Sequence, residues 1–283
     1  MAGLPLLPDL PGVPDLIPRP AVLVFAGLDP SGGAGLAADI AAISAMGAHA
    51  MPVITVLTAQ DNDRVHKIEP VEPEWILQQA QVLIDKIPIA AVKIGIVGSL
   101  ANAIVLSVLI AQLREKQPDL PVVLDPVLAS GHGDALAQDD ALMIIAPLLS
   151  WASVILPNYP EAVRLTGLHE AKAQAQWLMQ LGCGAVLLKG GHAEPGMDGA
   201  GQVVNRWFDA QGEQSWCWPR LPGSFHGSGC TLAASLAAAL ALHLPDPARQ
   251  AQAYTQQALA GAYAIAPGQL MPLRSGIWQQ EKT

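Results

Sequence analysis

A short glycine-rich stretch, Phe225–Thr231 (FHGSGCT), holds the residue types best suited to chemistry in this chain. It leads into Leu232–Leu242, which is rich in Ala and Leu and free of Pro and Gly, and so predicts a buried helix. The first N–H groups of a helix lack partners within it and lie at the positive end of its dipole. Gly227, Ser228 and Gly229 are therefore predicted to form a cup for a phosphate or a developing phosphoryl charge.

Cys230 follows the cup and falls in the first turn of the predicted helix. A helix N-terminus can lower the pKa of a thiol and make its thiolate available as a base. A plainer interpretation stays open at this point, in which a glycine-rich turn caps a core helix and Cys230 is a small apolar residue. The residues upstream must decide between the two.

The composition limits the class of protein. The chain has 283 residues, 51% hydrophobic and 14% charged, which is enough apolar material for one large α/β domain or two small ones. The net charge is -9 and no cluster of Lys or Arg occurs, so we expect neither nucleic acid nor an anionic membrane as a partner. Three cysteines without paired spacing argue against a disulfide framework or a zinc site and fit a reducing cytoplasm.

The ends of the chain are predicted to lie outside the core. Residues 1–20 contain six prolines and no basic region of the kind that begins a secretory signal, so we expect a Pro-rich arm. No apolar run reaches transmembrane length without a Pro, a Gly or a charge. We assign residues 21–267 to a single domain and residues 268–283 to a C-terminal tail.

Short apolar strands alternate with helices through most of the domain. The strands are predicted at Ala21–Gly27, Met51–Thr58, Ala90–Ile96, Pro121–Asp125, Ser153–Leu156 and Ala185–Lys189. The helices between them are predicted at Leu36–Met46, Pro73–Ile87, Ser99–Glu115, Asp139–Leu149, Pro160–Leu165 and Glu170–Leu181. This alternation is typical of a mostly parallel sheet covered on both faces, a three-layer α/β/α sandwich.

The alternation of strands and helices ends after the strand at Ala185–Lys189. Gln202–Asp209 and Gln214–Trp218 alternate polar and apolar residues around a turn, which predicts a hairpin at the edge of the sheet. The helix after Cys230 and a last helix over Pro247–Ile265 complete the domain.

Polar groups follow the predicted strands at the ends where ligands bind to open parallel sheets. These strand ends are Gly27/Asp29, Thr58/Gln60, Gly95/Ile96, Asp125/Val127, Asn158/Glu161 and Lys189/Gly190/Gly191. We expect them to converge on one rim together with the cup at Gly227. Asp125 and Glu161 are candidates to hold Mg²⁺, directly or through its waters. Lys189 is a candidate to neutralise phosphate oxygens, with a solvated strand-end lysine as the alternative.

A second glycine motif suggests a different activity. Gly33–Ala38 (GAGLAA) fits the dinucleotide fingerprint G-x-G-x-x-G/A and lies between a predicted strand and helix. An NAD-type oxidoreductase also needs an acidic residue at the end of its second strand, about 20 residues on. That strand ends in Thr58-Ala59-Gln60 instead, which argues against an oxidoreductase.

With these residues assembled, the chain resembles the hydroxymethylpyrimidine and phosphomethylpyrimidine kinases of thiamine biosynthesis, in the ribokinase-like superfamily. The resemblance covers about Ala21 to Leu242 and rests on the order of its motifs. They are Ala26–Gly35 (AGLDPSGGAG) with Ala38-Asp39, Val53–Gln60 (VITVLTAQ), Val92–Gly95 (VKIG), Val123–Val127 (VLDPV), Pro157–Glu161 (PNYPE), Val186–His192 (VLLKGGH) and His226–Thr231 (HGSGCT).

The resemblance implies a role for each candidate residue. In the family's pattern, the pyrimidine pocket corresponds to Gly27, Asp29 and Gln60, with Ile96 and Val127 as apolar walls. The metal-and-phosphate motif corresponds to Asn158 and Glu161, near Asp125, and the nucleotide side to Lys189 and Gly191. The anion hole corresponds to Gly227, Ser228 and Gly229, and the base for the substrate hydroxyl to Cys230.

The resemblance also implies the reaction and its cofactors. It implies a kinase that uses ATP and Mg²⁺ to phosphorylate 4-amino-5-hydroxymethyl-2-methylpyrimidine, its monophosphate, or both, as a cytoplasmic homodimer. A pyridoxal-type vitamin kinase of the same superfamily is the alternative. A ligand-binding protein without activity, on the same fold, is a more distant one.

The chain departs from the family's pattern at several positions. Leu28 stands where Ser or Thr is usual, Ile96 where Met is common, and Ser228 where Thr is common. The loop Ser130–Asp134 (SGHGD) lacks the Lys that the family often carries there, and His132 is only a partial substitute. The resemblance therefore leaves open whether one or both phosphorylations occur.

Overall fold

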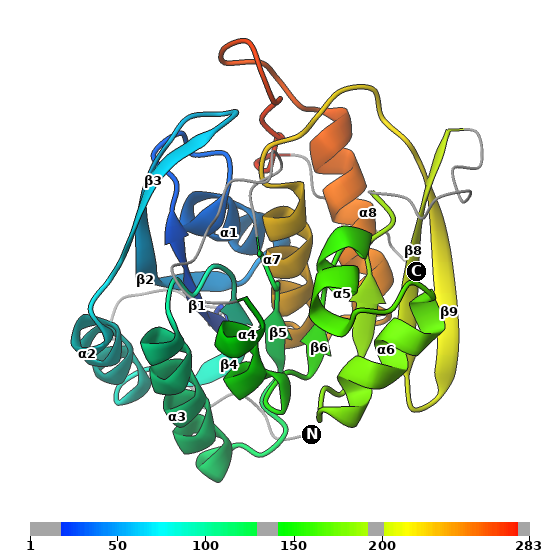
Figure 1. Ribbon diagram of the computed structural model, residues 1–283. Helices are drawn as coiled ribbons and strands as arrows, with labels where there is room; N and C mark the ends of the chain where they lie inside the picture. The colour runs from blue at the N-terminus through cyan, green and yellow to red at the C-terminus, as the bar shows by residue number, and fades with distance from the viewer. Residues whose placement is uncertain (1–17, 129–140, 192–200, 277–283) are drawn as a thin grey trace.

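The computed structural model of the chain describes residues 18–128, 141–191 and 201–276, and in these residues nine strands form one sheet (Figure 1). The strands are β1 (Ala21–Leu28), β2 (His49–Gln60), β3 (Val65–Pro70), β4 (Ile89–Ile94), β5 (Val122–Leu124), β6 (Val154–Ile155), β7 (Val186–Leu188), β8 (Gln202–Asp209) and β9 (Gly212–Pro219). Their order across the sheet is β3-β2-β1-β4-β5-β6-β7-β8-β9.

The centre of the sheet is parallel and both edges are antiparallel. Strands β2, β1, β4, β5, β6 and β7 pair in parallel, which confirms the predicted parallel sheet. The predicted edge hairpin is also confirmed, because β8 pairs antiparallel with both β7 and β9. Strand β3 was not predicted. It pairs antiparallel with β2 at the other edge, and its sequence (VHKIEP) mixes polar residues with apolar ones, none of which is fully buried.

Helices cover both faces of the sheet (Figure 1). They are α1 (Gly35–Met46), α2 (Pro73–Ile84), α3 (Leu100–Lys116), α4 (Ala141–Leu149), α5 (Tyr159–Thr166), α6 (Ala171–Gln180), α7 (Ser228–Ala241) and α8 (Pro247–Ala260). One face packs against α1, α7 and α8, and the other against α2 to α6. Neighbouring residues of β1 pack on opposite faces of the sheet. Val24 packs on the face covered by α1, α7 and α8, and Phe25 packs on the face covered by α2 to α6. The three predicted layers are therefore present.

The C-terminal part of the chain departs from the prediction. Helix α8 ends at Ala260 rather than Ile265, and the following chain doubles back so that Tyr263 pairs with Met271. Met271 is 3% exposed and Arg274 is 6% exposed. The packed chain therefore extends to at least Arg274 and does not stop at residue 267. Of the predicted N-terminal arm, only residues 18–20 are among those described.

The strand order creates the place for a site. After β1 the chain enters α1 on one face of the sheet, and after β4, the neighbour of β1, it enters α3 on the opposite face. The carboxyl ends of β1 and β4 therefore diverge, and such a switch point is where open α/β sheets bind ligands. Helix α7 packs against α1, β4 and β5 and begins beside this opening. Across the described residues, no helix combines the length and the apolar character that a membrane crossing requires.

Candidate active site

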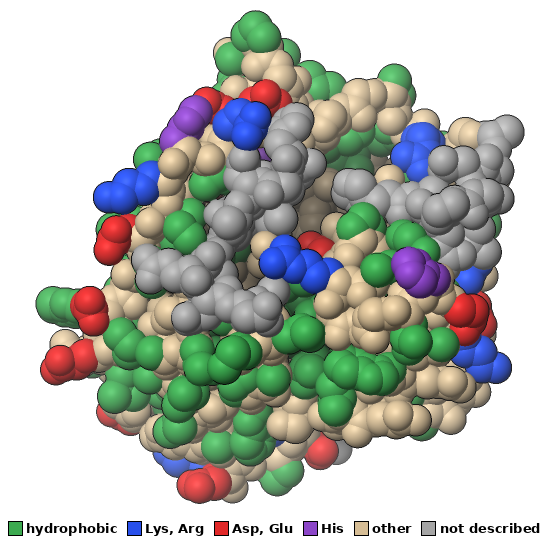
Figure 2. Space-filling model, in the orientation of Figure 1, with side chains coloured by type: hydrophobic (Ala, Val, Ile, Leu, Met, Phe, Trp, Pro, Cys, Tyr) green, Lys and Arg blue, Asp and Glu red, His purple; other side chains and the backbone are tan. Residues whose placement is uncertain are grey.

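A cleft of about 670 Å³ opens at the carboxyl ends of the parallel strands, and Figure 2 shows the hollow in this face of the molecule. It brings together all of the candidate residues except Asp29. Those that line it are Gly27, Gln60, Ile96, Asp125, Val127, Asn158, Glu161, Lys189, Gly191, Gly227, Ser228, Gly229 and Cys230. The rim inferred from separate strand ends is therefore one continuous surface.

Helix α7 begins at the cleft with an open N-terminus. Its N-cap is Gly227, in the left-handed conformation at φ 72°, and no side chain caps the first turn in the described structure. The first backbone bond of the helix runs from the N–H of Thr231 to the carbonyl of Gly227, at 2.9 Å. The N–H groups that precede it are the donors that an anion at a helix N-terminus accepts from.

Gly229, in this open turn, lies next to a charged pair formed by Lys189 and Asp125. A Cβ atom at Gly229 would lie 3.2 Å from Nζ of Lys189 and 3.7 Å from Oδ2 of Asp125. Any side chain at this position would thus occupy the space between the helix end and the two charges. The glycine keeps that space open for a ligand.

Lys189 lies between two carboxylates. Its Nζ donates to Oδ1 of Asp125 at 2.8 Å and lies 3.7 Å from Oε2 of Glu161. Burial favours the neutral amine, but the charges of Asp125 and Glu161 outweigh burial and raise the pKa of Lys189. The lysine is therefore a fixed cation rather than a solvated strand end. Oδ2 of Asp125 is buried and accepts no hydrogen bond from any residue that the structure describes, which makes it available to a ligand.

Asn158 and Glu161 begin α5 with a reciprocal pair of hydrogen bonds. Oδ1 of Asn158 accepts from the N–H of Glu161 at 2.8 Å, and Oε2 of Glu161 accepts from the N–H of Asn158 at 2.7 Å. Burial raises the pKa of the Glu161 carboxyl, against the opposing charge of Lys189. Both residues line the cleft, but their first role is to cap the helix.

Cys230 is held mostly as a thiol. Burial raises the pKa of Cys230 to about 11, although the positive charge of Lys93 acts in the opposite direction. The lowered pKa that a first-turn position allows is therefore not found, because desolvation of the thiol outweighs the positive charge of Lys93. At neutral pH only a small fraction of the thiol is ionised.

A buried ion pair lies close to Cys230. Nζ of Lys93 donates to Oδ2 of Asp39 at 2.8 Å, and neither side chain is exposed. Burial raises the pKa of Asp39 to about 6, while the charge of Lys93 lowers it. Both residues belong to motifs singled out in the sequence, but neither was assigned a role there. In the sequence, the only sign of this pair was that each charged residue stands among apolar neighbours.

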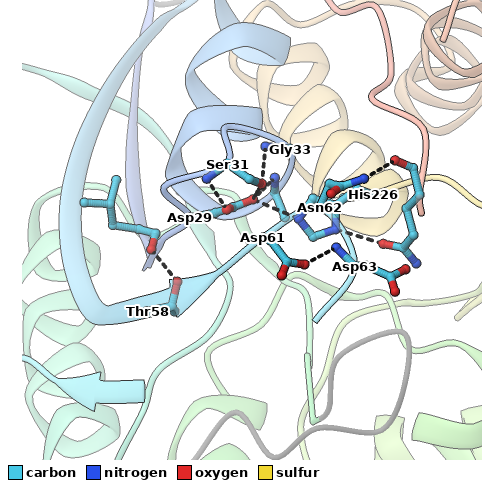
Figure 3. Close-up of polar contacts among 12 residues, drawn as sticks. Asp29, Ser31, Gly33, Thr58, Asp61, Asn62, Asp63 and His226 are labelled. Atoms are coloured by element: carbon cyan, nitrogen blue, oxygen red, sulfur yellow. Dashed lines mark hydrogen bonds and ion pairs between the residues drawn. The ribbon is translucent and has the colours of Figure 1, made fainter. Parts of the chain in front are cut away.

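Asp29 does not reach the cleft, contrary to the prediction that it lines the pyrimidine pocket. Its carboxylate accepts from the N–H groups of Ser31 and Ala34 at 2.8 and 2.7 Å, and from the Ser31 hydroxyl at 3.0 Å. Nε2 of His226 lies 2.9 Å from Oδ2, and Figure 3 shows the ring beside the Asp29 loop. Burial raises the pKa of Asp29, but these hydrogen bonds together lower it. Asp29 therefore organises the loop after β1 and is 2% exposed.

Close packing explains the glycines of the dinucleotide-like motif. Gly35 has φ 52°, and a Cβ atom there would lie 2.2 Å from the carbonyl oxygen of Gly27. A Cβ atom at Gly33 would lie 2.1 Å from the ring of His226. Both glycines are required for the backbone of this loop to approach its neighbours.

A polar network on the nucleotide side was missed in the sequence. Oδ1 of Asn205 accepts from the N–H of Gly190 at 2.9 Å, and its Nδ2 donates to Oε1 of Gln252 at 2.9 Å. Trp218 donates to the same oxygen of Gln252 at 2.9 Å. The one feature of the sequence that could have indicated this network is Asn205, a polar residue within the alternating pattern of the predicted edge strand. The altered loop Ser130–Asp134, with His132, lies outside the described residues.

Comparison with known proteins identifies the family. The family model for phosphomethylpyrimidine kinase matches residues 29–272. The hydroxymethylpyrimidine/phosphomethylpyrimidine kinase of Escherichia coli K12 is 36% identical over 256 residues, which cover 87% of this chain and 93% of the relative.

Solved structures share the fold. The phosphomethylpyrimidine kinase of Clostridium difficile 630 superposes with a TM-score of 0.70 at 30% identity, covering 85% of this chain and all of the other. A Staphylococcus aureus pyridoxal kinase, solved with AMP-PCP and pyridoxal, gives a TM-score of 0.77 at 24% identity over 91% of this chain and 94% of its own. The chain thus belongs to the phosphomethylpyrimidine kinase family and is a kinase with the ribokinase-like fold.

Proposed function

We propose that this kinase transfers the γ-phosphoryl group of ATP to 4-amino-5-hydroxymethyl-2-methylpyrimidine, or to the monophosphate formed from it, in thiamine diphosphate biosynthesis. The observation that carries the proposal is the open N-terminus of α7, which faces Lys189 and Asp125 across one cleft. The Escherichia coli relative, which has both activities in its name, and the Clostridium difficile structure, which is named for the second, support it.

The pyrimidine ring would occupy the part of the cleft next to Gln60. This side chain ends β2, and its amide can pair with a ring nitrogen and the exocyclic amine. Gly27 and Ile96 form an apolar wall beside it, since a Cβ atom on Gly27 would lie 3.7 Å from Cδ1 of Ile96. Val127 lines the same cleft. A flat ring with polar edges fits such a slot.

Phosphoryl transfer relies mainly on positioning and charge stabilisation. The N–H groups after Gly227 would donate hydrogen bonds to the oxygens of the transferred phosphoryl group as negative charge develops on them, and Lys189 would neutralise these oxygens from the opposite side. On the nucleotide side, Asn158 and Gly191 line the cleft beside Lys189. The cup and the lysine together would carry the larger part of the rate enhancement.

A metal ion fits beside the two carboxylates, mainly through the phosphates and water. The described residues contain no group of three or more His, Cys, Asp or Glu side chains that would hold a metal by itself. The buried Oδ2 of Asp125, which has no hydrogen-bond partner within the described part of the chain, is a suitable oxygen donor. Asp125 and Glu161 would therefore hold Mg²⁺, directly or through its waters. When bound, the ion would supply charge neutralisation for the transferred phosphate.

The thiolate form of Cys230 would take the proton of the substrate hydroxyl at Sγ while the hydroxyl oxygen forms its bond to the transferred phosphorus. Its raised pKa means that little thiolate is present at neutral pH. The proton would therefore move late, as negative charge leaves the attacking oxygen, and base assistance would be a smaller effect than the cup.

A coupled assay for ADP release tests the proposed substrate. We expect turnover with the hydroxymethylpyrimidine or its monophosphate, no turnover with ribose, and loss of turnover when a chelator removes Mg²⁺. Assaying both pyrimidines separately decides whether one or both steps occur. Faster turnover of pyridoxal than of either pyrimidine would replace this proposal with a pyridoxal kinase.

The proposal also includes a homodimer in the cytoplasm. Sedimentation equilibrium of the full chain would test the dimer through its mass. Fractionation of cells that express the chain would test the compartment.

A further inference from the structure

Arg274 is a buried cation near the anion cup. The side chain is 6% exposed, and its Nε donates to Oγ1 of Thr231 at 2.9 Å. Burial lowers the pKa of the guanidinium from its ordinary value. Among the described residues Arg274 forms no ion pair with a carboxylate, so hydrogen bonds to neutral groups must offset its desolvation.

The other partners of Arg274 are backbone carbonyl oxygens from two loops. One terminal nitrogen donates to Gly33 at 2.5 Å and to His226 at 3.2 Å, and it lies 3.5 Å from the oxygen of Gly227. Gly33 belongs to the loop after β1, whereas His226 and Gly227 lead into α7. A single guanidinium thus joins the glycine-rich loop to the start of the cup.

The two loops touch backbone to backbone where Arg274 joins them. A Cβ atom at Gly227 would lie 2.1 Å from the carbonyl oxygen of Gly33 and 3.0 Å from the Arg274 nitrogen. The carbonyl oxygens of Gly33, His226 and Gly227 all face the same guanidinium nitrogen, whose positive charge offsets the repulsion among them. The hydroxyl of Thr231 adds a further link, because it donates to the oxygen of Gly227 at 2.8 Å.

Arg274 is itself anchored. Tyr254 of α8 donates through its hydroxyl to the Arg274 carbonyl at 2.8 Å. Four residues earlier, Leu270 accepts from the N–H of His226 at 2.9 Å. Asn62, shown in Figure 3, donates to the carbonyls of Pro267 and Gln269 at 3.2 and 3.1 Å. The C-terminal segment therefore holds Arg274 rigidly against the loops.

We propose that Arg274 is a positioning residue for phosphoryl transfer, because it fixes the orientation of the Gly227 peptide and the first turn of α7 from outside the cleft. Arg274 does not line the cleft, so its effect passes through Gly227 and Thr231. The inference rests on the proposed phosphoryl transfer, and it assigns a part in the reaction to a segment beyond the last helix.

Kinetics of Arg274 variants test the proposal. We expect Arg274→Met to lower kcat by about 10²-fold, with KM for ATP and for the pyrimidine changed by less than about 3-fold, since misplaced donors act on the transition state. Arg274→Lys keeps a buried cation and should recover part of kcat. The matched control is Arg249→Met, an exposed arginine of α8, which should turn over at the parent rate.

A second pair of variants avoids a failure to fold. Thr231→Val removes the hydroxyl that Arg274 and Gly227 share, and Thr231→Ser keeps it. We expect the valine variant to lower kcat about 10-fold while the serine variant does not. Parent-like kcat in Arg274→Met, or equal kcat in Thr231→Val and Thr231→Ser, would overturn the proposal. Failure of the proposed function is distinguishable from failure of the Arg274 proposal, because in that case the parent protein itself would phosphorylate no pyrimidine.

Discussion

Two helices begin at the cleft, and they begin in opposite ways. Asn158 and Glu161 close the start of α5 by bonding reciprocally to each other's backbone N–H groups. The start of α7 has Gly227 as its N-cap and no side-chain cap among the described residues. Both starts line the same cleft, so exposure to solvent does not explain the difference.

The contrast shows which helix end is prepared for an anion. A capped end has already used its donors, whereas an open end keeps them for a ligand. The surroundings agree with this division. The open end faces Lys189 and the unpartnered oxygen of Asp125, while the closed end contributes a buried carboxylate. Substitutions at the two ends should therefore affect different quantities.

Filling the open end should have the largest effect. Gly229→Val places a side chain about where Nζ of Lys189 and Oδ2 of Asp125 approach the cup. We expect kcat to fall by about 10³-fold or more in a folded protein, because the transferred phosphoryl group loses its donors. Ala101→Val, in the exposed first turn of α3, is the matched control for added volume. Near-normal kcat in Gly229→Val would mean that the phosphate binds elsewhere.

Removing the thiol beside the open end should have the next largest effect. We expect Cys230→Ala to lower kcat by about 10²-fold with little change in KM for ATP. Because burial raises the pKa of Cys230 to about 11, its thiolate fraction rises about tenfold for each unit of increase in pH as long as the pH stays below that value. The parent kcat should therefore rise between pH 7 and 9, whereas Cys230→Asp, partly active, should show a flat profile.

The activity of the alanine variant decides the role of the thiol. A parent-like kcat in Cys230→Ala would make Cys230 a packing residue, and the helix end alone would then carry the chemistry. Rates should be measured with the phosphoryl-transfer step limiting, so that product release does not hide the profile.

Gln60 tests the substrate side of the cleft without altering either helix. Gln60→Leu should weaken pyrimidine binding by about 1–3 kcal/mol, since a buried polar edge of the ring would lose its partner. Isothermal titration with the pyrimidine measures this change, and KM for ATP serves as the internal control. Unchanged affinity would place the ring away from β2.

Opening the closed helix end should have the smallest effect. Asn158→Ala removes the cap of α5 and should lower the free energy of unfolding by about 1 kcal/mol. Ser99→Ala removes the cap of α3, which does not line the cleft, and should cost a similar amount. Urea unfolding compares the two variants. Only Asn158→Ala should also raise KM for ATP, and an equal KM in both would limit Asn158 to capping.

Local sequence was enough to predict the elements that build the cleft. An apolar run between turn residues predicts a buried strand, and an Ala- and Leu-rich run predicts a helix, because both patterns depend on neighbouring residues. The strand at Val65–Pro70 escaped prediction because edge pairing with β2, and not apolar burial, holds it in place. The early end of α8 was not predicted because it depends on Met271, eleven residues beyond the helix, which pairs with Tyr263.

The candidate site, too, has features that the sequence predicts and features that depend on the tertiary structure. Parallel strands end at one edge of a sheet, so the sequence by itself determined that Gln60, Asp125, Lys189 and the Gly227 cup would meet. Only the tertiary structure decided which charges face the cleft. Asp29 pairs with His226, 197 positions later, instead of lining the cleft, and Arg274 reaches Gly33 across 241 positions. A buried polar group takes whichever partner the packed layers bring within hydrogen-bond distance, and no local pattern records that choice.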